Sequence, residues 1–156
     1  MQTLLSDDEI ASLNVDLETL QPSDILAWAL EKSGLEKLAI ASAFQTEGTV
    51  VIHMATRIRP DVPILFLETG FQFAETLAFK QQLAERLSLN VIDLVGEYSN
   101  DRQQAEFGAR LFERNPEMCC EINKVRPMFE ALRGLDADRC ARARRGRFRC
   151  RLERLP

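Results

Sequence analysis

The sequence predicts an α/β fold in which helices flank a parallel β-sheet. Three short apolar runs, at residues 38–41, 62–67 and 90–95, have the length and composition of buried strands. The segments between them repeat apolar residues at helical spacing. Strands that alternate with helices through short connections form parallel sheets with right-handed crossovers. No Gly/Ser-rich linker marks a second domain.

Helices are expected around and after these strands. The acidic segment 7–21 is expected to form short helical pieces, and the next helix is expected to begin at Pro22 with Ser23 as its N-cap and to end at Gly34. The apolar stripe that starts at Val50 predicts a helix that stops before Pro60. Further helices are expected over residues 73–87, 101–112 and 117–132.

Composition and charge indicate a soluble cytoplasmic protein. Hydrophobic residues make up 46% and charged residues 28% of the 156 residues, as in ordinary globular proteins. No run of apolar residues is long enough to span a membrane. The N-terminal segment is acidic and lacks a basic region, so no secretory signal is predicted and the expected compartment is the cytoplasm. Four cysteines in a cytosolic chain favour metal or redox chemistry over structural disulfides.

Two polar turns follow neighbouring predicted strands. The first contains Ser42, Phe44, Gln45, Thr46, Glu47 and Gly48, and the second contains Glu68, Thr69 and Gly70. In open α/β sheets, ligands bind beyond the carboxyl ends of the strands, and a helix N-terminus there offers free N–H groups to a phosphate. Neither turn is a Walker loop or a Gly-x-Gly-x-x-Gly loop. Each turn alone fits an ordinary connection, whereas the two together favour a nucleotide site.

The adjacent pair Cys119 and Cys120 is the third candidate feature. A disulfide between neighbouring cysteines strains the chain, whereas two thiolates can ligate iron or another thiophilic metal. Lys124 and Arg126 follow closely, and such cations lower thiol pKa values and favour an anion. Two buried structural cysteines in a helix are the alternative. The single histidine, His53, lies in no cluster, which argues against zinc hydrolysis and Ser-His or Cys-His catalysis.

Taken together, these segments resemble the adenylyl sulfate and phosphoadenylyl sulfate reductases, which belong to the adenine nucleotide α-hydrolase-like, PP-loop-related superfamily. The resemblance covers about residues 20–137 and also includes Lys124-Val125-Arg126-Pro127 and Gly134-Leu135-Asp136-Ala137. It implies that the turn from Ser42 to Gly48 is a modified phosphate-binding loop. It also implies that Glu68, Thr69 and Gly70 lie near the adenosine, with Glu68 replacing the family's aspartate.

The same resemblance implies a cofactor and partners. Cys119 and Cys120 match the first two ligands of a 4Fe–4S cluster, so half of the cluster's ligands are present, and Lys124 matches a lysine between the cluster and the phosphosulfate. The paired cysteines favour adenylyl sulfate over phosphoadenylyl sulfate as substrate. In the family, a C-terminal cysteine attacks the sulfate sulfur, and a thioredoxin-type thiol then releases sulfite. A homodimer is a further expectation, since missing strands leave an open sheet edge.

The chain departs from the family after residue 137. Residues 1–137 are expected to form an incomplete nucleotide-binding domain, and residues 138–156 an arginine-rich tail foreign to the family. The tail carries a net charge of +6, which leaves −10 on residues 1–137. Its composition resembles a GC-rich gene translated out of frame. The family's nucleophilic cysteine, second cysteine pair and substrate-binding arginines are absent, and Cys140 and Cys150 are assigned to none of these roles. The truncated chain is therefore expected to be inactive.

Two other functions are compatible with parts of the sequence. A nucleotidyl-transfer relative, such as an ATP sulfurylase small subunit, would carry a full Ser-Gly-Gly-x-Asp-Ser loop, which is absent. A nucleotide- or RNA-binding fragment would use the basic tail, and its RNA affinity would fall steeply with salt and disappear with the tail.

Overall fold

The computed structural model describes residues 6–32, 38–134 and 139–142, and it contains a four-stranded parallel sheet. The strand order is β3-β2-β1-β4. The strands are β1 (Leu38–Ala41), β2 (Pro63–Glu68), β3 (Asn90–Val95) and β4 (Arg139–Arg142). The predicted parallel α/β architecture and its three predicted strands are confirmed.

Helical segments surround this sheet. They are α1 (Asp7–Glu18), α2 (Pro22–Ala27), η1 (Trp28–Lys32), α3 (Thr46–Ile58), α4 (Ala74–Leu87), α5 (Asn100–Phe107), α6 (Leu111–Arg114), α7 (Pro116–Cys120), η2 (Glu121–Val125) and α8 (Arg126–Gly134), where η denotes a π-helical turn. No helix among the described residues is both long enough and apolar enough to cross a membrane.

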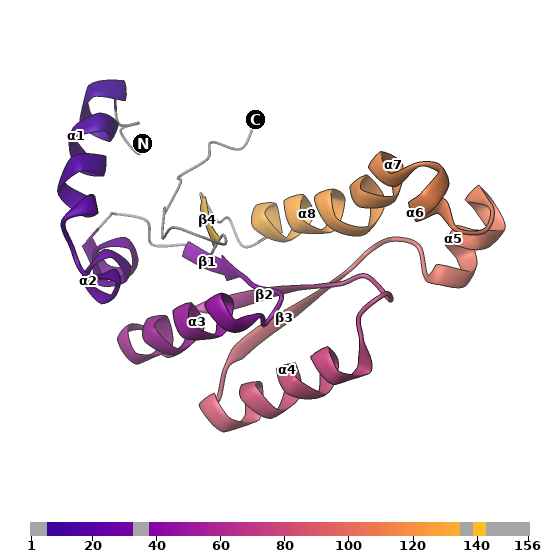
Figure 1. The fold of residues 1–156 in the computed structure, drawn as a ribbon, viewed down its shortest axis with the longest axis horizontal. Helices are drawn as coiled ribbons and strands as arrows, with labels where there is room; N and C mark the ends of the chain where they lie inside the picture. Colours follow the sequence, from indigo (N-terminus) through magenta and orange to yellow (C-terminus); the bar gives the residue numbers. More distant parts are fainter. Residues whose placement is uncertain (1–5, 33–37, 135–138, 143–156) are drawn as a thin grey trace.

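The sheet is covered on both faces. Figure 1 shows α3 and α4 on one side of the strands and α8 on the other. Because side chains alternate along a strand, neighbouring residues supply two separate cores. In β2, Ile64 and Phe66 face the core that contains residues of α3 and α4, whereas Leu65 faces the core that contains Leu132 of α8. All three strand residues are fully buried, which explains the continuous apolar run of this central strand.

The fourth strand was not predicted. β4 pairs in parallel with β1, with Leu38 opposite Arg139 and Ala41 opposite Arg142. This pairing is made by backbone groups, so a sequence without an apolar run can supply it. The strand order reverses at β1, because β2 and β3 lie on one side of it and β4 on the other.

Two helix boundaries differ from the predictions. The N-cap of α2 is Gln21 rather than Ser23, because Pro22 occupies the first helical position, where its missing N–H costs nothing. The helix predicted over 101–112 breaks into α5 and α6, since Gly108 (φ 81°) and Arg110 (φ 55°) both adopt positive φ values. The predicted end of a helix at Gly34 lies outside the described residues.

The first helix carries a reciprocal cap. The Ser6 backbone N–H and hydroxyl both donate to the Glu9 carboxylate, at 2.7 and 2.9 Å, and the Glu9 N–H donates back to the hydroxyl. The hydrogen bond from the Ser6 backbone, followed by that from its side chain, lowers the pKa of Glu9. The acidic segment 7–21 thus contains one capped helix instead of short pieces.

A matched pair of phenylalanines tests the core between the sheet and α3. Phe66 is fully buried, whereas Phe79 on α4 is 43% exposed. We expect Phe66→Ala to lower the free energy of unfolding by about 3–5 kcal/mol. Phe79→Ala should lower the free energy of unfolding much less, because the Phe79 ring already contacts solvent. Urea denaturation followed by circular dichroism measures both, and equal losses would contradict the assignment of Phe66 to the core.

Candidate functional site

Both predicted polar turns lie at the carboxyl edge of the sheet. β1 and β2 are parallel neighbours, with Ile40 opposite Ile64 and Ala41 opposite Leu65. The turns that leave these two strands therefore emerge side by side. The edge also includes the point where the strand order reverses, which is where open α/β sheets form their ligand crevice. The topology thus brings the two candidate turns together.

The first turn is held in shape by two hydrogen bonds and by one buried ring. The Ser42 N–H donates to the Leu65 carbonyl at 3.0 Å, and the Ser42 hydroxyl accepts from the Phe44 N–H at 3.0 Å. Phe44 adopts the left-handed conformation (φ 56°), which is costly for a bulky residue. Its ring is buried and meets Phe66 edge to face at 5.7 Å between centroids. The buried ring anchors this backbone conformation, so Phe44 offers a ligand only main-chain atoms.

The turn delivers the N-terminus of α3 to the same edge. Gln45 is the N-cap and makes no side-chain capping bond, and Gln45, Thr46 and Glu47 are exposed. The first N–H groups of a helix lack intrahelical partners and carry the positive end of its dipole. Among the described residues, the buried Thr49 hydroxyl in this first turn has no hydrogen-bond partner. The N–H groups at the exposed start of the helix can bind an anion.

Gly48 is required by the close approach of Ser42. A Cβ at position 48 would lie 2.5 Å from the Ser42 hydroxyl oxygen. The absence of a side chain lets the serine fold over the helix start while it bonds the Phe44 N–H. The glycine therefore shapes the loop, and it does so without a positive φ.

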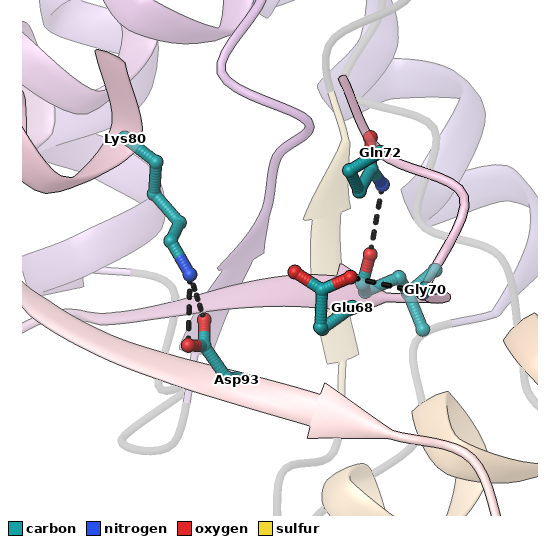
Figure 2. A network of polar contacts seen from close by, with 6 residues as sticks. Glu68, Gly70, Gln72, Lys80 and Asp93 are labelled. Atoms are coloured by element: carbon teal, nitrogen blue, oxygen red, sulfur yellow. Dashed lines mark hydrogen bonds and ion pairs between the residues drawn. The ribbon is translucent and has the colours of Figure 1, made fainter. Parts of the chain in front are cut away.

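The second turn is closed by hydrogen bonds, as Figure 2 shows. The Glu68 carboxylate accepts from the Gly70 N–H at 2.9 Å, and Gly70 has a positive φ of 74°. The Gln72 side chain donates to the Leu67 carbonyl at 3.0 Å. Asn100, from the start of α5, donates to the Gly70 carbonyl at 2.9 Å. Asn100 was not predicted from the sequence, because it lies thirty residues after the glycine to which it donates.

An ion pair braces the sheet beneath this turn. Lys80 of α4 donates to both carboxylate oxygens of Asp93, at 2.7 and 2.8 Å, and its ammonium lies 4.4 Å from the centroid of the Phe66 ring. Figure 2 shows Lys80 and Asp93 pointing toward each other. Asp93 lies on β3, the outermost strand on this side of the sheet, so the ion pair links α4 to that strand.

The cysteine pair lies at the junction of α7 and η2. The Cys119 side chain is partly buried and hydrogen bonded, whereas Cys120 and Lys124 are exposed. The π-helical turn packs closely on the chain after β3, since a Cβ at Gly96 would lie 2.9 Å from the Ile122 carbonyl oxygen. η2 also contacts β2, so this segment approaches the sheet near the strand that carries the second turn. Two buried carboxamides that the sequence did not indicate, Gln103 and Asn123, also lie here, and each is 3% exposed.

The donor chemistry at this junction fits half of an iron–sulfur site. Cys119 and Cys120 supply two thiols, and an amide N–H already points at one of the sulfurs. A 4Fe–4S cluster takes four thiolates. Within the ranges that the structure describes, no group of three or more histidine, cysteine or carboxylate side chains lies together, so the other two ligands are not found there.

The structure is thus an α/β protein in which a helix N-terminus and two polar turns meet at the carboxyl edge of a parallel sheet, with a thiol pair on a separate helical segment. Residues 37–146 match the family model of the phosphoadenosine phosphosulfate reductase domain, a match that includes the first part of the arginine-rich segment. The chain belongs to this family.

Named relatives agree with this assignment. The chain is 36% identical over 129 residues to adenosine 5'-phosphosulfate reductase of Halalkalibacterium halodurans, covering 82% of this chain and 55% of the relative. It is 42% identical over 116 residues to phosphoadenosine 5'-phosphosulfate reductase of Gloeobacter violaceus, covering 74% and 48%. The chain thus spans about half the length of the curated relatives it matches.

A solved structure shares the fold. The crystal structure of phosphoadenylyl-sulfate reductase from Candida auris, a phosphate complex, superposes with a TM-score of 0.81 at 25% identity. The match covers 94% of this chain and 72% of that chain. The PP-loop-related fold predicted for the sequence is confirmed.

Two substitutions test the loop geometry. Gly48→Ala should lower the free energy of unfolding by about 1–3 kcal/mol, because the new methyl group collides with the Ser42 hydroxyl. Gly134→Ala is the control, since a Cβ there would meet nothing within 4 Å. In a Ser42→Ala chain the colliding oxygen is absent, so adding Gly48→Ala should lower the free energy of unfolding less than it does in the parent chain. Thermal denaturation compares Ser42→Ala, Gly48→Ala, the double variant and Gly134→Ala, and an equal loss from Gly48→Ala in both backgrounds would contradict the collision.

Proposed function

We propose that this chain is the nucleotide-binding part of a sulfonucleotide reductase, the enzyme that reduces adenylyl sulfate or phosphoadenylyl sulfate to sulfite during sulfate assimilation. AMP or adenosine bisphosphate is the other product. The observation that carries the proposal is the rigid first turn, which presents a free helix N-terminus beside the second turn in a member of this family. The expected compartment is the cytoplasm.

In this proposal the two turns bind different parts of the substrate. The N–H groups at the start of α3, with Ser42, Gln45 and Thr46, receive the anionic phosphosulfate, because helix N-termini favour negative charge. The second turn, from Glu68 to Gly70, lies against the adenosine. Its carboxylate is held by the Gly70 N–H, so this turn offers a preformed surface.

Lys124 and the cysteine pair serve the sulfate end. The exposed ammonium of Lys124 lies on the turn that carries the thiols, and it neutralises the phosphosulfate when the substrate is bound. Cys119 and Cys120 would be the first two ligands of a 4Fe–4S cluster, and we assign no residue of this chain as the other two. When bound, such a cluster adds charge and polarisability beside the substrate.

The reaction itself needs a further cysteine and a reductant. A cysteine thiolate attacks the sulfate sulfur, the S–O bond to the nucleotide phosphate breaks, and AMP leaves with that electron pair. A thioredoxin-type dithiol then attacks the S-sulfonate, expels sulfite, and is oxidised to a disulfide as its second thiol restores the cysteine. We assign no residue of this chain as that nucleophile, and we propose that the 156 residues bind nucleotide without reducing it.

Adenylyl sulfate binding tests the role of Lys124. Lys124→Ala should weaken the binding of adenylyl sulfate about tenfold, the effect of a lost hydrogen bond to a charged group. Adenosine binding should not change, because it lacks the phosphosulfate. Arg126→Ala is the control, since this neighbouring exposed cation pairs with Glu121 at 3.3 Å. Isothermal titration calorimetry measures each affinity, and equal losses in both variants would contradict a specific role for Lys124.

A turnover assay tests the absence of reduction. We expect the chain, incubated with sulfur-labelled adenylyl sulfate, thioredoxin and thioredoxin reductase, to release no sulfite above a protein-free blank, although it binds the nucleotide. Sulfite release would contradict the proposal and would point to Cys140 or Cys150 as nucleophile. Cys140→Ser and Cys150→Ser would then identify the cysteine responsible.

A further inference from the structure

Two buried carboxamides connect α5 to the turn that carries the cysteine pair. Gln103 and Asn123 are each 3% exposed, and they exchange two hydrogen bonds. The Gln103 amide N–H donates to the Asn123 oxygen at 3.1 Å, and the Asn123 N–H donates to the Gln103 oxygen at 3.3 Å. Buried polar groups are costly unless they are paired, so this pair forms only when α5 and η2 are docked.

The Asn123 amide also reaches Cys119. Its nitrogen donates to the Cys119 carbonyl oxygen at 2.9 Å and to the Cys119 sulfur at 3.5 Å. A backbone carbonyl can only accept, so the nitrogen side of the carboxamide must face Cys119. The oxygen side then faces Gln103, whose side-chain N–H donates to it. Gln103 thus helps to set the direction in which Asn123 presents its N–H to the thiol.

The adjacent thiols therefore stand in different surroundings. Cys119 is partly buried and receives an amide N–H, whereas Cys120 is exposed. Groups that hydrogen bond to metal ligands fix their orientation, and their loss commonly weakens metal binding. Neither the phosphate-binding loop nor the adenosine turn includes Gln103 or Asn123.

We propose that Gln103 is a positioning residue that acts through Asn123 to orient the Cys119 sulfur toward a thiophilic metal. The proposal rests on the proposed function for the ligand role of the cysteine pair. It adds that the direction of this ligand is set from α5, twenty residues earlier in the chain. Gln103 touches neither substrate nor metal.

Nuclear magnetic resonance tests the coupling on the metal-free chain. In a nitrogen-15-labelled protein, the side-chain N–H signals of Asn123 should move on Cys119→Ala and on Gln103→Met. They should stay in place on Cys120→Ala, the matched change at the neighbouring thiol, and on Gln104→Met, the same change at the exposed neighbour on α5. Unmoved Asn123 signals in the Cys119→Ala chain would overturn the proposal.

Cadmium binding tests the consequence for the metal site. In a Cys140→Ser/Cys150→Ser chain, Cd²⁺ titrated against thiolate-to-metal ultraviolet absorption should bind roughly tenfold more weakly after Gln103→Met. Gln104→Met should leave the affinity unchanged. Equal affinities in the two variants, or no cadmium absorption in the parent chain, would overturn the proposal. Should Gln103→Met fail to fold, Gln103→Asn, which keeps the amide but withdraws it from Asn123, replaces it in both experiments.

The nucleotide part of the proposed function is judged separately, by adenylyl sulfate titration of the same samples. If nucleotide binding is normal but the cadmium or resonance experiment contradicts the expected result, only the positioning role of Gln103 is overturned. Lost nucleotide binding in the parent chain would sink the proposed function instead.

Discussion

Parallel pairing between β1 and β2 is the constraint on which the rest of the structure depends. Ile40 pairs with Ile64, and both are fully enclosed between the sheet and α3. Because the two strands run in the same direction, each must return through a helix, and both turns emerge at one edge. The proposed nucleotide site is thus a consequence of strand direction, and its residues come from segments more than twenty positions apart.

The sheet and its helices were predictable because a strand buried on both faces needs a continuous apolar run, which is visible in the sequence. The run Val62 to Leu67 is apolar throughout, as a central strand must be when α3 covers one face and α8 the other. β4 has no such apolar run, since a strand that pairs with β1 through backbone groups can carry arginines. The break at Gly108 was missed because a glycine inside a helical pattern shows its φ only in the structure.

The candidate site was only partly predictable, for a different physical reason. Ser42, Gly48 and Gly70 could be singled out because they act on their immediate neighbours in the chain. Asn100 could not, since its partner Gly70 is thirty residues away and the neighbouring Ser99 already caps the helix that Asn100 begins. The substrate-binding role predicted for Phe44 stays a prediction, and the structure adds that its ring lies in the core and anchors the loop.

The negative charge of the domain explains why the fixed shape of the first turn matters for anion binding. Residues 1–137 carry a net charge of −10, so their long-range field repels an anionic ligand such as the proposed sulfonucleotide. In the proposed function, attraction must then come from short-range groups, namely the N–H groups at the start of α3, which the loop fixes in place, and the exposed Lys124 ammonium. These N–H groups bind an anion best when the loop already has its final shape. Ordering the loop on binding would cost conformational entropy and reduce the free energy of binding. The strained Phe44 backbone, anchored by its buried ring and bonded to Ser42, supplies that shape before the ligand arrives. An acidic domain can therefore hold an acidic ligand through geometry that its core enforces.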